Sequence, residues 1–152
     1  QPHYCLAGDP LHFLDEALVI ANGGRYDQGY VYAHKKVDPQ DGFYTCHFYQ
    51  DPVMPGSLGI EAILEAMQVY ALEQNLGESF NSPRFGPVPD LNTVWKYRGQ
   101  IVSTNNDMSL EIHIKQMKQD NHQCIVIGDA SLWKEDMRIY EIKDVGICIS
   151  EA

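Results

Sequence analysis

The segment at residues 55–76 constrains the fold most strongly, because it predicts a single helix that is apolar on nearly every face. Pro55 and Gly56 stand where a helix can begin without losing a hydrogen bond, and Gly77 lies just past its end. The apolar side chains recur at helical spacing and are Leu58, Ala62, Ile63, Ala66, Met67, Tyr70 and Ala71. A narrow polar stripe between them consists of Glu61, Glu65 and Gln68. A helix with so little polar surface is buried on most sides, as it is when a sheet wraps around it.

The chain after this helix has the pattern of antiparallel strands. We predict three or four strands in succession, at residues 93–102, 108–117, 123–133 and 139–149. The connections between them are short and polar, which is typical of neighbouring strands in a β-meander. The intervening residues 78–90 are rich in Pro, Gly, Ser and Asn and are predicted to form a loop.

The chain before the helix is less regular. Residues 1–10 form an irregular lead-in, and the apolar residues 13–21 fit either a helix or a strand. Residues 26–37 and 43–48 favour strands. The predicted class is therefore α+β, a single domain in which a curved antiparallel sheet packs around one long helix.

The composition excludes several classes of function. The 152 residues include 11 Lys and Arg against 21 Asp and Glu, a formal net charge of −10. Nucleic acids and anionic membranes attract clustered cations, so neither is an expected partner. No apolar run has the length of a membrane span. The scattered Cys5, Cys46, Cys124 and Cys148 indicate neither a disulfide framework nor a metal site, and reduced thiols favour a cytoplasmic protein.

The run CHFYQDPVMPGSLGIE, residues 46–61, carries the chemistry. It places His47 at a predicted strand end, Gly56 at the helix N-terminus and Glu61 in the second helical turn, 14 positions after the histidine. A helix N-terminus presents N–H groups and a positive dipole to a carbonyl oxygen that gains negative charge, and glycine permits a close approach. A histidine can take a proton from the carbon beside that carbonyl, and a carboxyl group can protonate a leaving hydroxyl. Together these are the parts of a β-elimination.

Each part also has a structural interpretation. A histidine beside an aromatic residue is often structural, a glutamate on an apolar helix can simply face solvent, and Pro-Gly can merely start a helix. The co-occurrence of all three favours the catalytic interpretation.

The run HFYQDPVMPGSLGIEA closely resembles the active-site segment of the hot-dog-fold β-hydroxyacyl-thioester dehydratases. It is most similar to the 3-hydroxydecanoyl-ACP dehydratase/isomerase branch, with its pattern H-F-x-x-D-P-V-M-P-G-x-L-G. The segments DQGYVYA, WKYRGQI and IGDASLWKEDMRIYEIKDVGI resemble the same branch in order, so the resemblance spans about residues 11–149. It implies a hot-dog fold, a helix wrapped by an antiparallel sheet, in agreement with the layout above.

The resemblance implies that His47 is the catalytic base, Glu61 the catalytic acid and Gly56 the N–H donor to the thioester carbonyl. We expect further substrate contacts from Val53, Met54, Pro55, Ser57 and Phe85. No cofactor and no metal are implied. In this family the histidine and the acid of one site come from two neighbouring hot-dog units, so a homodimer or a tandem pseudo-dimer is expected. The substrate is expected on the phosphopantetheine arm of an acyl carrier protein.

Two positions depart from that branch. Glu61 stands where the branch has Asp, and Ser57 stands where it often has Cys. The general-chain-length dehydratases have Glu at the position of Glu61. We therefore expect dehydration of a (3R)-3-hydroxyacyl thioester to the trans-2-enoyl thioester, whereas isomerisation to a cis-3-enoyl product stays open.

The PGSLGIEA form, the net charge and the first residue, Gln1 instead of Met, favour a dehydratase domain cut from a larger synthase of polyunsaturated fatty acids or polyketides. Two alternatives stay open. One is a hot-dog acyl thioesterase, and the other is a non-catalytic hot-dog unit that completes a partner domain's site.

Overall fold

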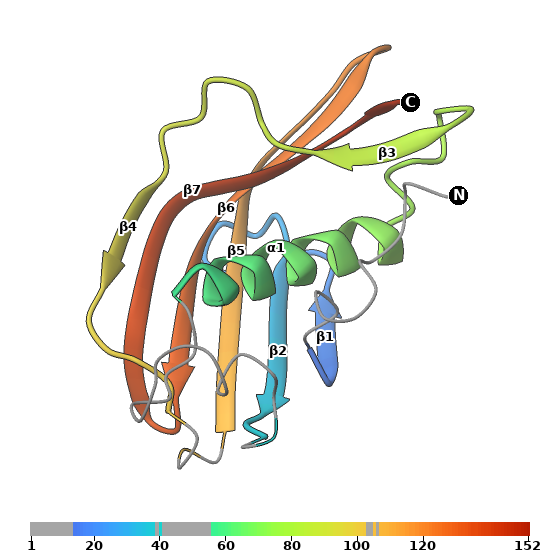
Figure 1. Ribbon diagram of the computed structural model, residues 1–152. Helices are drawn as coiled ribbons and strands as arrows, with labels where there is room; N and C mark the ends of the chain where they lie inside the picture. The colour runs from blue at the N-terminus through green and yellow to red at the C-terminus, as the bar shows by residue number, and fades with distance from the viewer. Residues whose placement is uncertain (1–13, 39, 41–55, 103–104, 106) are drawn as a thin grey trace.

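The computed structural model describes residues 14–38, 40, 56–102, 105 and 107–152, and these contain one helix and seven strands. Figure 1 shows the helix α1 (Gly56–Glu73) lying across the hollow side of a strongly curved sheet. The strands are β1 (Glu16–Ile20), β2 (Tyr30–Lys36), β3 (Pro83–Gly86), β4 (Val94–Tyr97), β5 (Asp107–Gln119), β6 (Gln123–Lys134) and β7 (Met137–Glu151).

All the strand pairs are antiparallel, and the order along the sheet is β1-β2-β5-β6-β7-β3, with β4 also paired to β7. The strand β7 is the longest. On the edge away from β6, residues 140–143 of β7 pair with β4, and residues 148–151 pair with β3. The sheet thereby continues on both sides of the bend in β7 that Figure 1 shows.

The core lies between α1 and the hollow side of the sheet. Alternate residues of the long strands point inward, as a half-buried strand requires. In β5 these are Met108, Leu110, Ile112 and Ile114. The buried face of α1 meets them with Ala62, Ile63, Ala66, Met67, Tyr70 and Ala71, and most of these side chains have no exposed surface. The predicted architecture, a long helix wrapped by a curved antiparallel sheet, is confirmed.

The structure decides one open prediction and leaves another untouched. The segment 13–21, for which helix and strand were both open, contains the edge strand β1. The strand predicted at 43–48 lies outside the described residues. No described helix is both long and apolar enough to span a bilayer.

The prediction of a loop throughout residues 78–90 is wrong, because β3 lies within it. This strand begins with Pro83 and ends with Gly86, both of which indicate loops from local sequence alone. An edge strand accepts a proline, since one side of its backbone needs no partner in the sheet. Its pairing with residues 148–151 of β7 is a long-range contact that composition does not reveal.

The meander is correct for β5, β6 and β7 but wrong for the strand predicted at 93–102. This strand is shorter, and it pairs with β7 instead of β5. Both edges of β5 are already occupied, by β2 and by β6, so β4 takes the open edge of β7. Arg98, just after β4, continues this pairing by donating its backbone N–H to the carbonyl of Ile139.

Candidate active site

The predicted motif is described from Gly56 onward, where α1 begins. His47, Val53, Met54 and Pro55 lie outside the described residues, so their roles stay predictions. Gly56 and Ser57 occupy the first positions of the helix. Backbone N–H groups in the first turn have no acceptor within the helix, and the helix dipole adds a positive partial charge there. This is the environment that the predicted role of Gly56 requires.

Gly59 allows the start of α1 to press directly against β7. A Cβ at Gly59 would lie 2.6 Å from Cζ and 2.7 Å from the hydroxyl oxygen of Tyr140, a side chain that is only 1% exposed. The rings of Trp95 and Tyr97 from β4 lie 5.5 Å and 5.0 Å from the Tyr140 ring. Burial raises the pKa of Tyr140 far above neutrality, so its hydroxyl stays protonated. This aromatic cluster fixes the end of the helix at which the predicted site lies.

Glu61 lies in the second turn of α1 and is exposed. Within the described part of the chain, no hydrogen bond or ion pair holds its carboxylate. Its neighbours along the solvent side of the helix are apolar, namely Ile60 and Leu64. The carboxylate is thus available to a substrate or to a second protein unit.

Glu65, one turn further along, has different surroundings. It is only 4% exposed, and its Oε1 accepts a hydrogen bond from the backbone N–H of Leu14 at 3.2 Å. The polar stripe predicted at Glu61, Glu65 and Gln68 is therefore not a continuous solvent-facing stripe. Glu65 holds the chain that enters β1 against the helix.

An apolar groove of about 490 Å³ runs along α1, and its lining includes Ile60 and Leu64 but not Glu61. Its helical wall consists of Ile60, Leu64 and Gln68, which lie at successive turns and span about 12 Å along the helix axis. Its other lining residues are Phe85, Gly86, Pro87, Val88, Leu91, Thr93, Val145, Gly146 and Ile147. The groove therefore lies between α1, β3, the segment 87–93 and the bend of β7.

Phe85, predicted to contact the substrate, does line this groove. Its position follows from β3, which pairs Phe85 with Ile149 at the upper end of β7. The remaining wall, residues 87–93, was not predicted from the sequence. Its Pro, Val and Leu residues gave only a loop signal, and the contacts that place them come from distant strands.

The described residues include no group of three or more His, Cys, Asp or Glu side chains arranged to bind a metal ion. Cys124 and Cys148, the described cysteines, are both free and buried. What the described residues bring together is a helix N-terminus, an exposed carboxylate and an apolar groove. That set can bind an acyl chain and supply an acid near one end of it.

Comparisons with known proteins agree with this geometry. The family model of the FabA-like domain matches residues 6–143. A curated relative, one of the subunits of the polyunsaturated fatty acid synthase of Thraustochytrium sp., is 30% identical over 140 residues. The match covers 91% of this chain but only 9% of that much longer protein.

Two solved structures share the fold at low sequence identity. One is the dehydratase heterocomplex ApeI:P from Xenorhabdus doucetiae, with a TM-score of 0.63 and 12% identity over 99% of this chain and 89% of that chain. The other is a hypothetical thioesterase protein with coenzyme A from Streptococcus pneumoniae TIGR4, with a TM-score of 0.52 and 11% identity over 95% and 94% of the two chains. These similarities establish the hot-dog fold.

Proposed function

The chain belongs to the FabA-like domain family, and from this membership we propose that it is a dehydratase acting on a (3R)-3-hydroxyacyl thioester. The substrate is carried by an acyl carrier protein, and the product is the trans-2-enoyl thioester. The chain spans 9% of the curated relative that it matches. We propose that it likewise works as one domain of a synthase that makes polyunsaturated fatty acids or related products.

The observation that carries this proposal is the exposed carboxylate of Glu61 beside the apolar groove. Ile60 and Leu64, which flank Glu61 on the helix, line the groove. In this proposal, the thioester end of a hydrocarbon chain in the groove lies near the carboxyl group of Glu61, which donates a proton in its acid form. The Glu61 carboxylate has no partner among the described residues, and so no evident structural use, whereas Glu65 on the same helix is held by a hydrogen bond.

The proposed reaction divides the proton transfers between two groups. His47 removes a proton from C2, and the electrons of that bond form the C2–C3 double bond. The C3–O bond breaks, and Glu61 in its acid form protonates the departing hydroxyl so that it leaves as water. The negative charge that builds up on the thioester oxygen is stabilised by the N–H of Gly56 and the dipole of α1.

A second hot-dog unit completes the site in this proposal. His47 and Glu61 of one chain would then serve different sites, either in a homodimer or in a pseudo-dimer with an adjacent domain. Two features support the need for a partner. Glu61 is open to solvent in the single chain, and all four residues of the edge strand β4 are exposed, including Trp95 and Tyr97. An exposed apolar edge strand is a surface on which another sheet can pair.

The partner that brings the substrate is proposed to be a tethered acyl carrier protein. Such carriers are acidic, and this chain has a net charge of −10, so long-range attraction does not assist their encounter. Cations that could form a basic patch are partly neutralised, since Lys115 is paired with two aspartates and Arg98 with Glu141. A tether replaces attraction with a high effective concentration. The cytoplasmic location predicted from the cysteines belongs to the same proposal.

The test is an assay of the purified chain with a (3R)-3-hydroxyacyl-pantetheine. The dehydratase forms the enoyl thioester, which is seen by its ultraviolet absorbance, and releases no free thiol. His47→Ala abolishes this activity while its circular dichroism spectrum stays that of the wild type. A folded His47→Ala protein with undiminished dehydration contradicts the proposal.

A thioesterase is the second candidate, because an exposed carboxylate such as Glu61 can also activate water for attack on a thioester. The hot-dog fold is shared with a structure described as a thioesterase. The same assay separates the two activities, since hydrolysis releases thiol without enoyl absorbance. If neither signal arises until an adjacent domain is added, His47→Ala and Glu61→Gln are assayed in that mixture. Loss of activity in either variant supports the catalytic pseudo-dimer, and full activity of both variants shows a non-catalytic unit that completes the partner's site.

A further inference from the structure

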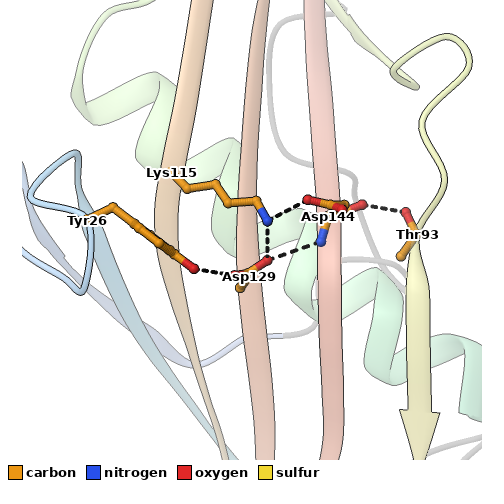
Figure 2. Close-up of polar contacts among 5 residues, drawn as sticks. All are labelled: Tyr26, Thr93, Lys115, Asp129 and Asp144. Carbon is orange, nitrogen blue, oxygen red and sulfur yellow. Dashed lines mark hydrogen bonds and ion pairs between the residues drawn. The ribbon is translucent and has the colours of Figure 1, made fainter.

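A charged cluster lies on the outer face of the sheet, the face opposite α1 (Figure 2). Lys115 Nζ lies 2.8 Å from Asp129 Oδ1 and 2.5 Å from Asp144 Oδ1. The Tyr26 hydroxyl donates to Asp129 Oδ2 at 2.7 Å, and the Thr93 hydroxyl donates to the backbone carbonyl of Asp144 at 2.6 Å. The Lys115 ammonium group therefore joins β5, β6 and β7. The Tyr26 hydroxyl connects the segment before β2 to β6, and the Thr93 hydroxyl connects the segment before β4 to β7.

The cluster lies where all three strands depart from regular geometry. The register of β5 shifts at Lys115, and the register of β6 shifts at Asp129. On β7, Asp144 has a φ of 61°, a left-handed conformation that residues other than glycine adopt infrequently. Its backbone N–H donates to Asp129 Oδ1 at 3.2 Å. Irregularities of this kind bend strands, so the cluster holds the bend of the sheet.

The groove lies on the other side of this bend. Residues 145–147, directly after the cluster on β7, form its floor, and Thr93 is part of its wall. A Cβ at Gly146 would lie 2.9 Å from Val88 Cγ2 and 3.2 Å from Leu91 Cδ2, so the segment 87–93 packs directly on β7. Packing at Gly146 and the Thr93 hydrogen bond together hold the wall against the floor.

The electrostatics of the cluster explain why its members depend on one another. Partial burial lowers the pKa of Lys115, but the hydrogen bonds to Asp129 and Asp144 outweigh this and raise it above its ordinary value. Burial raises the pKa of Asp129, but hydrogen bonds from Lys115 and Tyr26 outweigh it and hold the carboxyl ionised. Without the ammonium, two carboxylates would face each other and repel. The Asp144 side chain would then lose the ion pair that holds it beside its left-handed backbone.

We propose that Lys115, Asp129 and Asp144 are positioning residues that shape the acyl groove from the opposite face of the sheet. Within the described part of the chain, the groove lining includes Thr93 but none of these three residues. They act through the backbone of β7 and through Thr93, and they keep wall and floor close enough to contact an acyl chain along its length. This inference rests on the proposed function, because it takes the groove to be the acyl site.

The inference is tested by how strongly affinity depends on acyl chain length. The ligands are saturated acyl groups of six to twelve carbons linked to pantetheine through an amide, and binding to the full chain is measured by calorimetry. Burial of each methylene group in a fitted groove raises affinity about fourfold. We expect this fourfold increase per methylene group in the wild-type protein and only about a twofold increase in Lys115→Met. In the variant, the groove wall at residues 87–93 no longer contacts the acyl chain along its length.

Matched variants separate positioning from stability. Lys115→Arg retains a cation between the two carboxylates and is expected to restore the wild-type increment. Lys118→Met removes a lysine from the exposed end of the same strand and is expected to leave the increment unchanged. A loss of stability alone lowers affinity for every ligand by the same factor, so it does not change the increment.

The outcomes are distinct. A wild-type increment in folded Lys115→Met overturns the inference while leaving the proposed function intact. Absence of binding by the wild-type protein at every chain length contradicts the groove as the acyl site, and with it the basis of both proposals. If Lys115→Met does not fold, Thr93→Val and Thr93→Ser replace it, since they differ in the hydroxyl that binds the Asp144 carbonyl. Equal increments in these two variants overturn the inference.

Discussion

Glu61 and Glu65 lie one turn apart on the same face of α1, yet their surroundings differ. Glu65 is only 4% exposed, and its carboxylate accepts a backbone hydrogen bond from Leu14. Glu61 is exposed, and its helical neighbours Ile60 and Leu64 line an apolar groove. The two glutamates thus have different roles, because Glu65 stabilises the fold through its hydrogen bond and Glu61 has no hydrogen bond or ion pair within the described part of the chain.

The same distinction applies to the outer face of the sheet. Asp129 and Asp144 are bound to Lys115 and maintain a bend, as Glu65 maintains the position of β1. An acidic residue is therefore a catalytic candidate when neither packing nor hydrogen bonds within the fold hold it. Four experiments test this distinction between structural and catalytic acidic residues. They are given from the largest expected effect on stability to the smallest.

The largest loss of stability is expected from Gly59→Ala, where α1 packs against Tyr140 of β7. The added methyl group would lie within 2.7 Å of the Tyr140 hydroxyl, and that ring is enclosed by its neighbours. Overpacking of this kind costs about 1–3 kcal/mol, which is more than the gain in helix propensity. The loss is measured as the decrease in the free energy of unfolding in a urea titration. Gly86→Ala is the control, since in the described part of the chain no atom beyond the two adjoining residues lies within 4 Å of a Cβ at that position.

A smaller loss is expected from Glu65→Leu. The apolar side chain fits the buried site but leaves the Leu14 N–H without its present acceptor, at a cost of about 1–2 kcal/mol. Glu65→Gln retains a side-chain oxygen at nearly the same place and should retain most of the stability. Equal unfolding midpoints for Glu65→Leu and the wild type would show that the Leu14 contact is not stabilising.

The outer-face cluster gives a dependence of stability on pH. Hydrogen bonds from Lys115 and Tyr26, outweighing burial, place the folded pKa of Asp129 below its ordinary value near 3.8. Its contribution is therefore fully present above that value and is lost as the pH falls through the lower folded pKa. Asp129→Asn removes this part of the acid dependence. Thermal melts from pH 6 to pH 2 should show a shallower decline for the variant than for the wild type.

The smallest effect on stability is expected from Glu61→Gln. No described contact holds this carboxylate, so the free energy of unfolding should change by no more than about 0.5 kcal/mol. A loss of about 2 kcal/mol or more would place Glu61 with Glu65 among the residues that stabilise the fold, and the distinction between these two glutamates would fail.

The sequence predicts the regular parts of this fold well. Apolar spacing locates α1 to within a few residues, because burial on most sides imposes a pattern that solvent-exposed segments lack. Strict alternation locates β5, β6 and β7 for the same reason. The strands β3 and β4 are placed less well, since each pairs with distant residues of β7 at an open edge and neither has a buried face to impose a pattern.

The candidate site is predictable to a similar degree. The motif locates Glu61 and the start of α1. Phe85, expected separately as a substrate contact, lines the groove, and its contact with substrate stays a prediction. Neither the groove wall at 87–93 nor the Lys115 cluster can be found by spacing. Residues 115, 129 and 144 meet only through the registers of three strands, and bulges shift those registers by amounts that no local pattern encodes.

The rate of enoyl-thioester formation by Glu61→Gln, measured beside its unfolding midpoint, tests the central claim most directly. The account predicts a rate at least about a hundredfold below that of the wild type, as expected for removal of a general acid, with an unchanged midpoint. A variant with the wild-type midpoint and a rate within about threefold of the wild type would show that Glu61 is not the acid.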